Sequence, residues 1–242
     1  FMKSIFSLLI KVRDHLRMKK VEDEYLNWLR FANAGMISPG NIYAMKYAIE
    51  NLPTNDPIIE IGSFCGLSTN ILSYFLRKNQ KKNIIFCSDK WIFEGSEKST
   101  NLGLSDISHA DYRPFVKETF MRNINFFSPN RPHPIELFSD EFFAKWKNRN
   151  EVIDIFNQSM MLGGNISFGY IDGNHTYEFA KQDFENVNQH LVPGGFILFD
   201  DSDDSNPFGL TKLMGEIKQR SDYSLVMKNP NYLFQKNKML NK

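Results

Sequence analysis

Acidic side chains follow two apolar runs in the second half of the chain. Asp172 comes directly after the first run, and Asp200 and Asp201 come directly after the second. Neighbouring parallel strands that end level lie about 5 Å apart. If the two runs form such strands, and if the second strand breaks its alternation of faces at Asp201, the three carboxylates come close together. Because they cannot all stay ionised without a counter-charge, the pattern predicts a hard divalent cation, Mg²⁺ by default. The alternative is that the acids cap helices or point into solvent.

A histidine follows the first of these acids at short range. His175 comes three residues after Asp172, so both side chains can face one pocket. A neutral imidazole beside a metal-activated hydroxyl could accept its proton as a general base. Because a histidine in a loop often serves only as a hydrogen-bonding group, that alternative stays open.

The most specific motif of the chain is a glycine turn between an apolar run and a helical pattern. Its spacing is Glu-x-Gly-x-x-x-Gly, which differs from the Gly-x-Gly-x-x-Gly of dinucleotide sites. The acidic residue before the turn suits a ligand with an ammonium group, whereas a pyrophosphate prefers bare amides. The pattern predicts a strand, a tight turn and a helix whose N-terminus faces the ligand. The candidate ligand-binding residues are Glu60, Gly62, Ser63, Gly66 and Ser68.

Further candidates follow the next two apolar runs. Asp89 could accept both hydroxyls of a ribose, or it could be a helix cap or a solvated loop acid. Trp91 could close over the site, or it could pack against an adenine or in the core. Ser139 and Asp140 could reach an adenine edge, but they equally fit an ordinary helix N-cap.

The apolar runs alternate with helical patterns along the chain, and this alternation predicts how the candidate residues are positioned. It indicates an α/β fold with a mostly parallel sheet and helices on both faces. In such sheets, ligands bind outside the carboxyl ends of the strands, near the point where the strand order reverses. A hairpin around Asn229-Pro230-Asn231 is expected to end the sheet. The predicted strands are 57–61, 83–88, 134–138, 166–171, 195–200, 223–228 and 232–235.

The chain of 242 residues is 42% hydrophobic, which is enough for one sizeable core. We expect an N-terminal helical extension over residues 2–52, with helices at 21–33 and 40–52, and one α/β domain over 53–242. Residues 91–131 are long for a single crossover and predict a lid-like insertion, with disorder without function as the alternative. Within this insertion, residues 114–127 have a helical pattern.

Charge and cysteine content exclude several classes of protein. The net charge of +1 predicts no strong attraction to nucleic acid. Cys65 and Cys87 lie in or beside apolar runs and resemble small buried hydrophobes of a reducing compartment, so we expect a cytoplasmic protein without membrane spans. Residues 3–20 form a basic amphipathic pattern, which favours docking on the same domain or on a second subunit of a homodimer over contact with a membrane surface.

Together these segments resemble the metal-dependent class I O-methyltransferases that use S-adenosylmethionine, in particular the branch related to macrocin O-methyltransferase. The resemblance implies a Rossmann-like, seven-stranded sheet whose last strand is antiparallel. It also implies that Asp172, Asp200 and Asp201 hold Mg²⁺, that His175 is the base, and that the acceptor is a hydroxyl of a small molecule or sugar. Because some related sequences are described as hydroxylases, the motifs specify the cofactor better than the reaction. The matching segments are Glu60–Ser68, Asp89–Trp91, Ile171–Tyr177 and Pro193–Asp201.

Two other functions compete with this interpretation. A nicotinamide-dependent dehydrogenase has a related fold, but the glycine spacing is wrong for a dinucleotide. A module that binds S-adenosylmethionine without methyl transfer would have no need of the acidic trio and His175.

Overall fold

The structure is a computed structural model that describes residues 17–93, 101–205 and 209–238. Most of the basic segment 3–20 and part of the insertion 91–131 lie outside these residues. In the part of the chain that the structure describes, no helix is long and apolar enough to cross a membrane.

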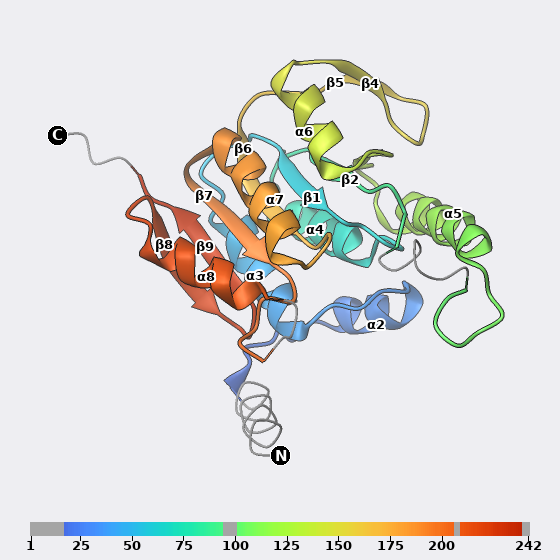
Figure 1. The fold of residues 1–242 in the computed structure, drawn as a ribbon, viewed down its shortest axis with the longest axis horizontal. Helices are drawn as coiled ribbons and strands as arrows, with labels where there is room; N and C mark the ends of the chain where they lie inside the picture. Colours follow the sequence, from blue (N-terminus) through green and yellow to red (C-terminus); the bar gives the residue numbers. More distant parts are fainter. Residues whose placement is uncertain (1–16, 94–100, 206–208, 239–242) are drawn as a thin grey trace.

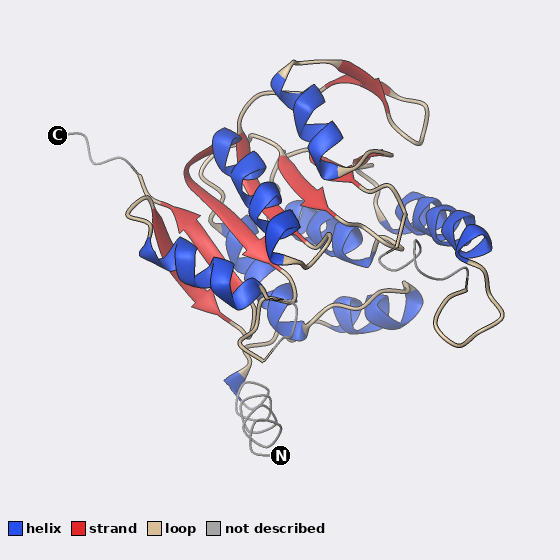
Figure 2. Cartoon of the chain, in the orientation of Figure 1, coloured by secondary structure: helices blue, strands red, loops and turns tan. Residues whose placement is uncertain are grey.

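A seven-stranded sheet forms the centre of the protein, with the strand order β3-β2-β1-β6-β7-β9-β8 (Figures 1 and 2). The first five strands in this order, β3, β2, β1, β6 and β7, are parallel to one another. The next strand, β9, runs antiparallel to both of its neighbours, β7 and β8. This arrangement confirms the predicted Rossmann-like sheet and its terminal hairpin. The strand order reverses between β1 and β6. The strands are β1 Ile58–Ile61, β2 Ile85–Ser88, β3 His133–Ile135, β6 Ile166–Ile171, β7 Leu191–Phe199, β8 Tyr223–Lys228 and β9 Tyr232–Lys236.

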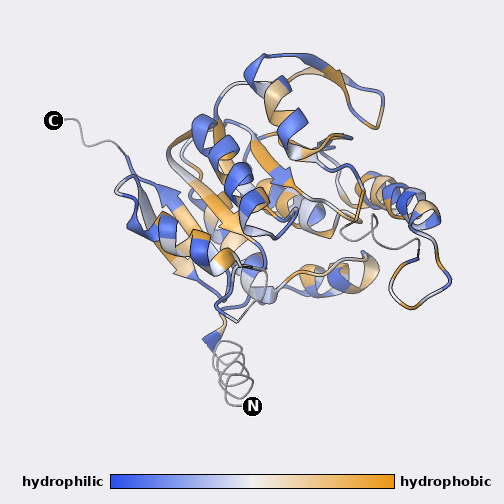
Figure 3. Cartoon of the chain, viewed as in Figure 1, coloured by the Kyte–Doolittle hydropathy of each residue, from blue (hydrophilic) through white to orange (hydrophobic). Residues whose placement is uncertain are grey.

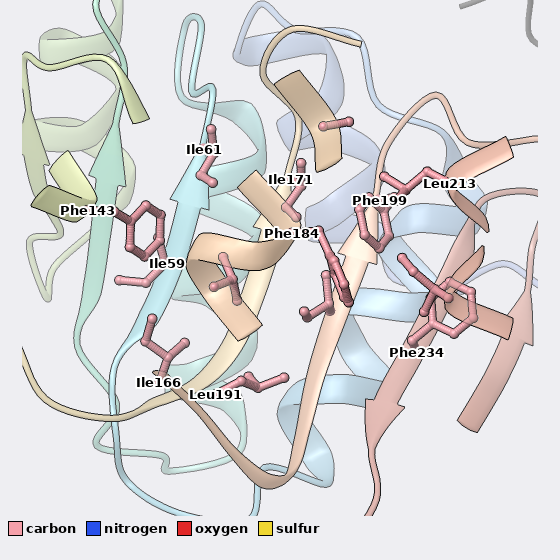
Figure 4. Close-up of a cluster of buried hydrophobic side chains, with 14 of the residues drawn as sticks. Ile59, Ile61, Phe143, Ile166, Ile171, Phe184, Leu191, Phe199, Leu213 and Phe234 are labelled. Carbon is pink, nitrogen blue, oxygen red and sulfur yellow. The ribbon is translucent and has the colours of Figure 1, made fainter. Parts of the chain in front are cut away.

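Helices cover both faces of the sheet, and a large apolar core lies on each side. On one face, α6, α7 and α8 cover an apolar cluster that includes Phe143, Phe184 and Phe234, all labelled in Figure 4. On the other face, α2, α3 and α4 bury side chains such as Leu29, Ala48 and Phe75. In Figure 3, β1 and β7 are largely hydrophobic, whereas the sides of α7 and α8 that face the viewer are largely hydrophilic. The helices are α2 Glu24–Ala32, α3 Pro39–Glu50, α4 Leu67–Lys78, α5 His109–Phe127, α6 Ser139–Lys147, α7 Tyr177–His190 and α8 Leu210–Gln219.

Several elements differ from the sequence-based expectation, and β7 begins at Leu191 rather than at residue 195. The hairpin of β4 (Glu151–Ile153) and β5 (Ser159–Met161) was not predicted, because its short strands are largely exposed and lack a clear apolar alternation. β3 ends three residues earlier than expected. α5 begins at His109 rather than at residue 114, because Ser108 caps it and Pro114, which resembles a start signal, lies inside the helix.

Candidate active site

The residues that follow four neighbouring strands lie at one edge of the sheet. The backbone N–H of each of these residues donates to the carbonyl of the last residue in the adjacent strand of the sheet, so the strands end level. In Figure 1 the arrowheads of β1 and β7 point toward the side of the protein where α2 lies. The four hydrogen bonds join Asp89 to Ile135 (3.3 Å), Gly62 to Ser88 (3.0 Å), Asp172 to Ile61 (2.8 Å) and Asp200 to Ile171 (2.9 Å).

The predicted acids and the histidine come together at this edge. Ile171 and Phe199 are register partners in β6 and β7, so Asp172 and Asp200 emerge side by side. Asp201 has a φ of +47°, in the left-handed region, which breaks the alternation of β7 as the prediction required. His175 lies between the acids, with Nε2 3.4 Å from Asp172 Oδ1 and Nδ1 3.1 Å from Asp201 Oδ2.

Three buried polar residues, which the sequence analysis missed, orient two of these carboxylates. Asn41 of α3 and Asn231, just before β9, both donate to Asp200 Oδ1, the latter over 2.8 Å. The hydroxyl of Tyr170 donates to Asp172 Oδ2 over 3.0 Å. The sequence could have indicated these three residues only by the position of a polar group within an apolar segment or a turn. These contacts fix the two carboxylates in one orientation before any ligand binds.

The environment of the cluster shifts its proton affinities. Burial raises the pKa of Asp200 well above its ordinary value, and the charge of Asp172 raises it further. Burial alone would lower the pKa of His175, but its hydrogen bonds with Asp172 and Asp201 outweigh burial and raise it to about 10. At neutral pH, without another cation, the imidazolium is therefore the counter-charge of this acidic cluster.

The types of ligand atom in the acidic cluster suit a hard cation, although the side chains are not arranged as a complete coordination site. Among the described residues, no group of three or more His, Cys, Asp and Glu is already arranged to hold a metal ion. The donor set nevertheless consists of carboxylate oxygens, the ligands that Mg²⁺ prefers. Asp172 and Asp200 hydrogen-bond to each other, and burial raises the pKa of both carboxyls. Such a pair gains most from a divalent counter-charge.

The glycine turn has the predicted strand, turn and helix geometry. Gly62 and Gly66 have φ values of +81° and +85°, which side chains rarely adopt. A Cβ at Gly62 would lie only 2.0 Å from the carbonyl oxygen of Asp172. The turn after β1 therefore packs directly against the start of the loop that carries Asp172 and His175.

Glu60 is fully buried beneath this turn rather than exposed at its surface. Its Oε2 accepts hydrogen bonds from the hydroxyls of Ser63 (3.2 Å) and Thr69, and Ser68 also lies beside the carboxylate. Burial raises the pKa of Glu60, and none of the described residues makes a hydrogen bond to its buried Oε1. In this structure Glu60 therefore organises the turn and the first turn of α4.

Asp89 clamps the same turn from β2. Its Oδ2 accepts the backbone N–H groups of Ser63 (2.8 Å) and Phe64 (3.0 Å), and its Oδ1 accepts that of Trp91 (2.6 Å). Trp91 is buried in a cluster with Phe120 of α5, and its indole N–H donates to the Phe64 carbonyl. Both residues support the turn, and direct contacts with a cofactor remain predictions for them.

A buried amide network ties the segment after α2 to the glycine turn. Asn33 donates to the carbonyl of Cys65 over 3.0 Å, and Asn123 of α5 donates to the same oxygen over 2.8 Å. Asn70 of α4 donates to Asn33 over 2.7 Å. The sequence analysis missed these residues as well, because no local pattern joins them.

Ser139 and Asp140 begin α6, beyond the end of β3, with Phe138 as the N-cap residue. Asp140 is exposed and accepts the N–H of Glu141, so its visible role is helix capping. Ser139 hydrogen-bonds to Asp183, a buried acid of α7 that the sequence analysis did not single out. Burial is the main cause that raises the pKa of Asp183 to about 6. The negative charge of Asp140 also raises this pKa, whereas the hydrogen bond with Ser139 lowers it.

Asp183→Asn is expected to stabilise the protein at pH 7.5. The pKa of Asp183 in the folded protein, about 6, exceeds the ordinary pKa of 3.8 for an aspartic acid, so the fold favours the protonated acid. Ionising Asp183 lowers the free energy of unfolding. This loss is nearly absent below pH 4, grows as the pH rises from about 4 to about 6, and reaches about 2–3 kcal/mol above that. Urea unfolding should show the variant more stable at pH 7.5 and nearly equal to wild type at pH 4. A gain of the same size at both pH values would contradict this explanation.

A cavity of about 710 Å³ opens beside the acidic cluster. Asp200, Asp201 and Asn231 line one part of it, and Arg30 and Phe31 of α2 line another. The predicted cofactor residues of the glycine turn do not line this cavity, although their neighbour Leu67 does. The cavity therefore joins the acidic cluster to the N-terminal helices.

Comparison with known proteins gives the family. A model of a methyltransferase domain matches residues 59–202, more than half of the chain. None of the curated proteins matches it in sequence. The O-methyltransferase from Bacillus cereus, solved with SAH, has a TM-score of 0.53 at 16% identity over 90% of this chain and 92% of its own. SAH-bound PaMTH1 from Podospora anserina has a TM-score of 0.57 at 13% identity over 96% of both chains. CalS11, a TDP-rhamnose 3'-O-methyltransferase of calicheamicin biosynthesis, has a TM-score of 0.52 at 16% identity over 81% of this chain and 78% of its own.

The solved structures are too distant in sequence to show more than a common fold. The match to the methyltransferase domain extends from β1 to Ser202, just beyond the acidic residues that follow β7. It thus includes the glycine turn, Asp89, the loop with His175 and the acidic trio. The chain therefore belongs to the methyltransferase domain family, and its fold is that of the class I S-adenosylmethionine-dependent methyltransferases.

Proposed function

We propose that the protein transfers the methyl group of S-adenosylmethionine to a hydroxyl oxygen of a small molecule or sugar, with Mg²⁺ at the acidic cluster. The observation that carries this proposal is the meeting of Asp172, Asp200 and His175 at the level ends of β6 and β7, beside a cavity and next to the glycine turn. Such a site can hold an acceptor oxygen close to a methyl donor bound at the turn.

The glycine turn fits the donor. The N-terminus of α4 follows Gly66 directly, and its unpaired amides favour a carboxylate such as that of S-adenosylmethionine. Asp89 and Glu60 hold the turn in shape from below. We assign Gly62, Ser63, Gly66 and Ser68 to the donor site, Asp89 and Trp91 to its ribose side, and Ser139 and Asp140 to its adenine side.

The acidic cluster fits the acceptor chemistry. Asp172, Asp200 and Asp201 would hold Mg²⁺, which lowers the pKa of an acceptor hydroxyl when bound. With a divalent cation as the counter-charge of the cluster, His175 would no longer be needed as an imidazolium, and its neutral ring could accept a proton. We assign proton removal to Nε2 of His175, because the shorter contact of Nδ1 with Asp201 fixes the ring in place. Asn41, Asn231 and Tyr170 keep Asp200 and Asp172 in position during the transfer. The rest of the rate comes from holding oxygen and methyl carbon in line.

Chelation of divalent metal is expected to stop methyl transfer and to leave cofactor binding intact. With radiolabelled S-adenosylmethionine and vicinal diols such as catechol and TDP-rhamnose as acceptors, EDTA should lower turnover at least about 100-fold, because metal activation supplies several kcal/mol. Excess Mg²⁺ should restore it. Calorimetric titration with S-adenosylhomocysteine should give the same affinity in both states.

The two measurements separate the parts of the proposal. Turnover that survives EDTA would refute the metal and keep the methyltransferase. S-adenosylhomocysteine binding without methyl transfer to any hydroxyl would instead favour a binding protein. No binding of S-adenosylhomocysteine would refute the donor site itself.

A further inference from the structure

The cavity beside the acidic cluster has a cation in its wall. Arg30 lies in the last turn of α2 and is exposed. Among the described residues, no carboxylate forms an ion pair with its guanidinium. The cavity thus has carboxylates at the proposed chemical centre and an uncompensated positive charge on α2.

Large apolar side chains stand next to this cation. Phe31 is 93% exposed and Met36 is 88% exposed, and both line the cavity. Folding gains nothing from leaving them in water, whereas apolar groups around a cavity are typical of ligand sites. At about 710 Å³, the cavity is also within the range of ligand pockets, roughly 300–1,000 Å³.

The element that carries Arg30 is held at both ends. At its start, Asp23 accepts hydrogen bonds from Tyr74 (2.6 Å) and Lys78 (2.7 Å) of α4. At its end, Asn33 is bound to the glycine turn and to Asn70. A wall fixed in this way presents its side chains without a large ordering cost when a ligand binds.

We propose that the acceptor is a sugar that carries a negatively charged group, and that Arg30 binds this group while Phe31 and Met36 pack against its apolar surface. This inference rests on the proposed function and adds the chemical class of the acceptor. A guanidinium binds a phosphate or a carboxylate through two parallel hydrogen bonds, which an ammonium group cannot reproduce. The anionic group therefore orients the acceptor so that a hydroxyl reaches the acidic cluster.

Two probes distinguish the sources of the charge. TDP carries a diphosphate and glucuronate carries a carboxylate, and each is titrated into the protein loaded with S-adenosylhomocysteine and Mg²⁺. Wild type should bind at least one of them. Arg30→Gln should weaken that binding about 10- to 100-fold, as expected for a lost charge-assisted hydrogen-bond pair. Arg30→Lys should recover only part of it.

Control variants and turnover complete the test. Arg122→Gln changes another exposed arginine, on α5, and should leave probe binding unchanged. Methyl transfer to TDP-rhamnose should have a higher KM in Arg30→Gln, whereas transfer to free rhamnose should be unaffected by the substitution. Thermal unfolding should be alike in all variants, because Arg30 is exposed.

The outcomes separate this inference from the proposed function. Equal probe binding by wild type and Arg30→Gln would overturn the inference, and so would failure of both probes to bind a protein that still binds S-adenosylhomocysteine. Neither result would affect methyl transfer to neutral hydroxyl compounds. Loss of S-adenosylhomocysteine binding in wild type would refute the proposed function instead.

Discussion

Asp200→Asn is expected to lower methyl transfer at least about 100-fold and to leave the affinity for S-adenosylhomocysteine nearly unchanged. The substitution removes one negative ligand from the proposed metal site. It preserves the shape of the side chain, and the amide oxygen can still accept the hydrogen bonds of Asn41 and Asn231. The fold should therefore survive, and thermal stability at neutral pH should not fall, because the buried charge of Asp200 is itself unfavourable.

Turnover and calorimetry on the same preparation test this expectation. Asp56→Asn is the matched control, since Asp56 lies before β1 and its carboxylate accepts an exposed hydrogen bond from the hydroxyl of Thr54, far from the acidic cluster in the sequence. Unchanged turnover in Asp200→Asn would remove Asp200 from the metal site. An equal loss of turnover and cofactor affinity would move it to the donor site.

Asp89→Ala is expected to weaken S-adenosylhomocysteine binding by about 100-fold or more. Hydrogen bonds to a charged group are worth about 1.5–3 kcal/mol each, and Asp89 accepts three from the backbone. These bonds also hold Phe64 and Trp91 at φ values of +45° and +51°, which cost energy to maintain. Without the carboxylate, the turn that faces the donor relaxes, and any contact with the ribose is lost as well.

Thermal unfolding of the ligand-free variant separates the two roles of Asp89. A clamp predicts a clear drop in Tm together with the loss of affinity. A residue that only contacts the ribose predicts lost affinity at an unchanged Tm. Asp56→Ala should change neither quantity, and wild-type affinity in Asp89→Ala would refute both roles.

Local patterns were sufficient to predict the sheet and the edge of the sheet at which the acidic residues and His175 come together. The apolar runs before Glu60, Asp89, Asp172 and Asp200 became parallel strands, and only the short exposed hairpin of β4 and β5 escaped notice. The prediction succeeded because the ends of buried strands are marked in the sequence by the change from apolar to polar residues. Once these ends are known, the geometry of a parallel sheet brings them to one edge.

The supporting contacts could not be predicted in the same way. Asn41 and Asp200 are 159 residues apart in the chain, and Asn33 and Cys65 are 32 apart. No periodicity links such pairs, because they meet only when α3 packs on the sheet and α2 packs on α4. The sequence alone likewise gave no reason to expect that Glu60 and Asp89 would clamp the turn from below, because burial depends on which helices cover it.

The sequence by itself therefore determined the sheet, the glycine turn and the identity of the acidic trio, since each depends on short-range alternation and on residues at strand ends. Only the tertiary structure decided how His175 bridges Asp172 and Asp201, which amides hold Asp200, and that α2 supplies a cavity wall with Arg30. The physical reason is that hydrogen bonds and ion pairs between distant segments form only after the apolar cores on both faces of the sheet have packed.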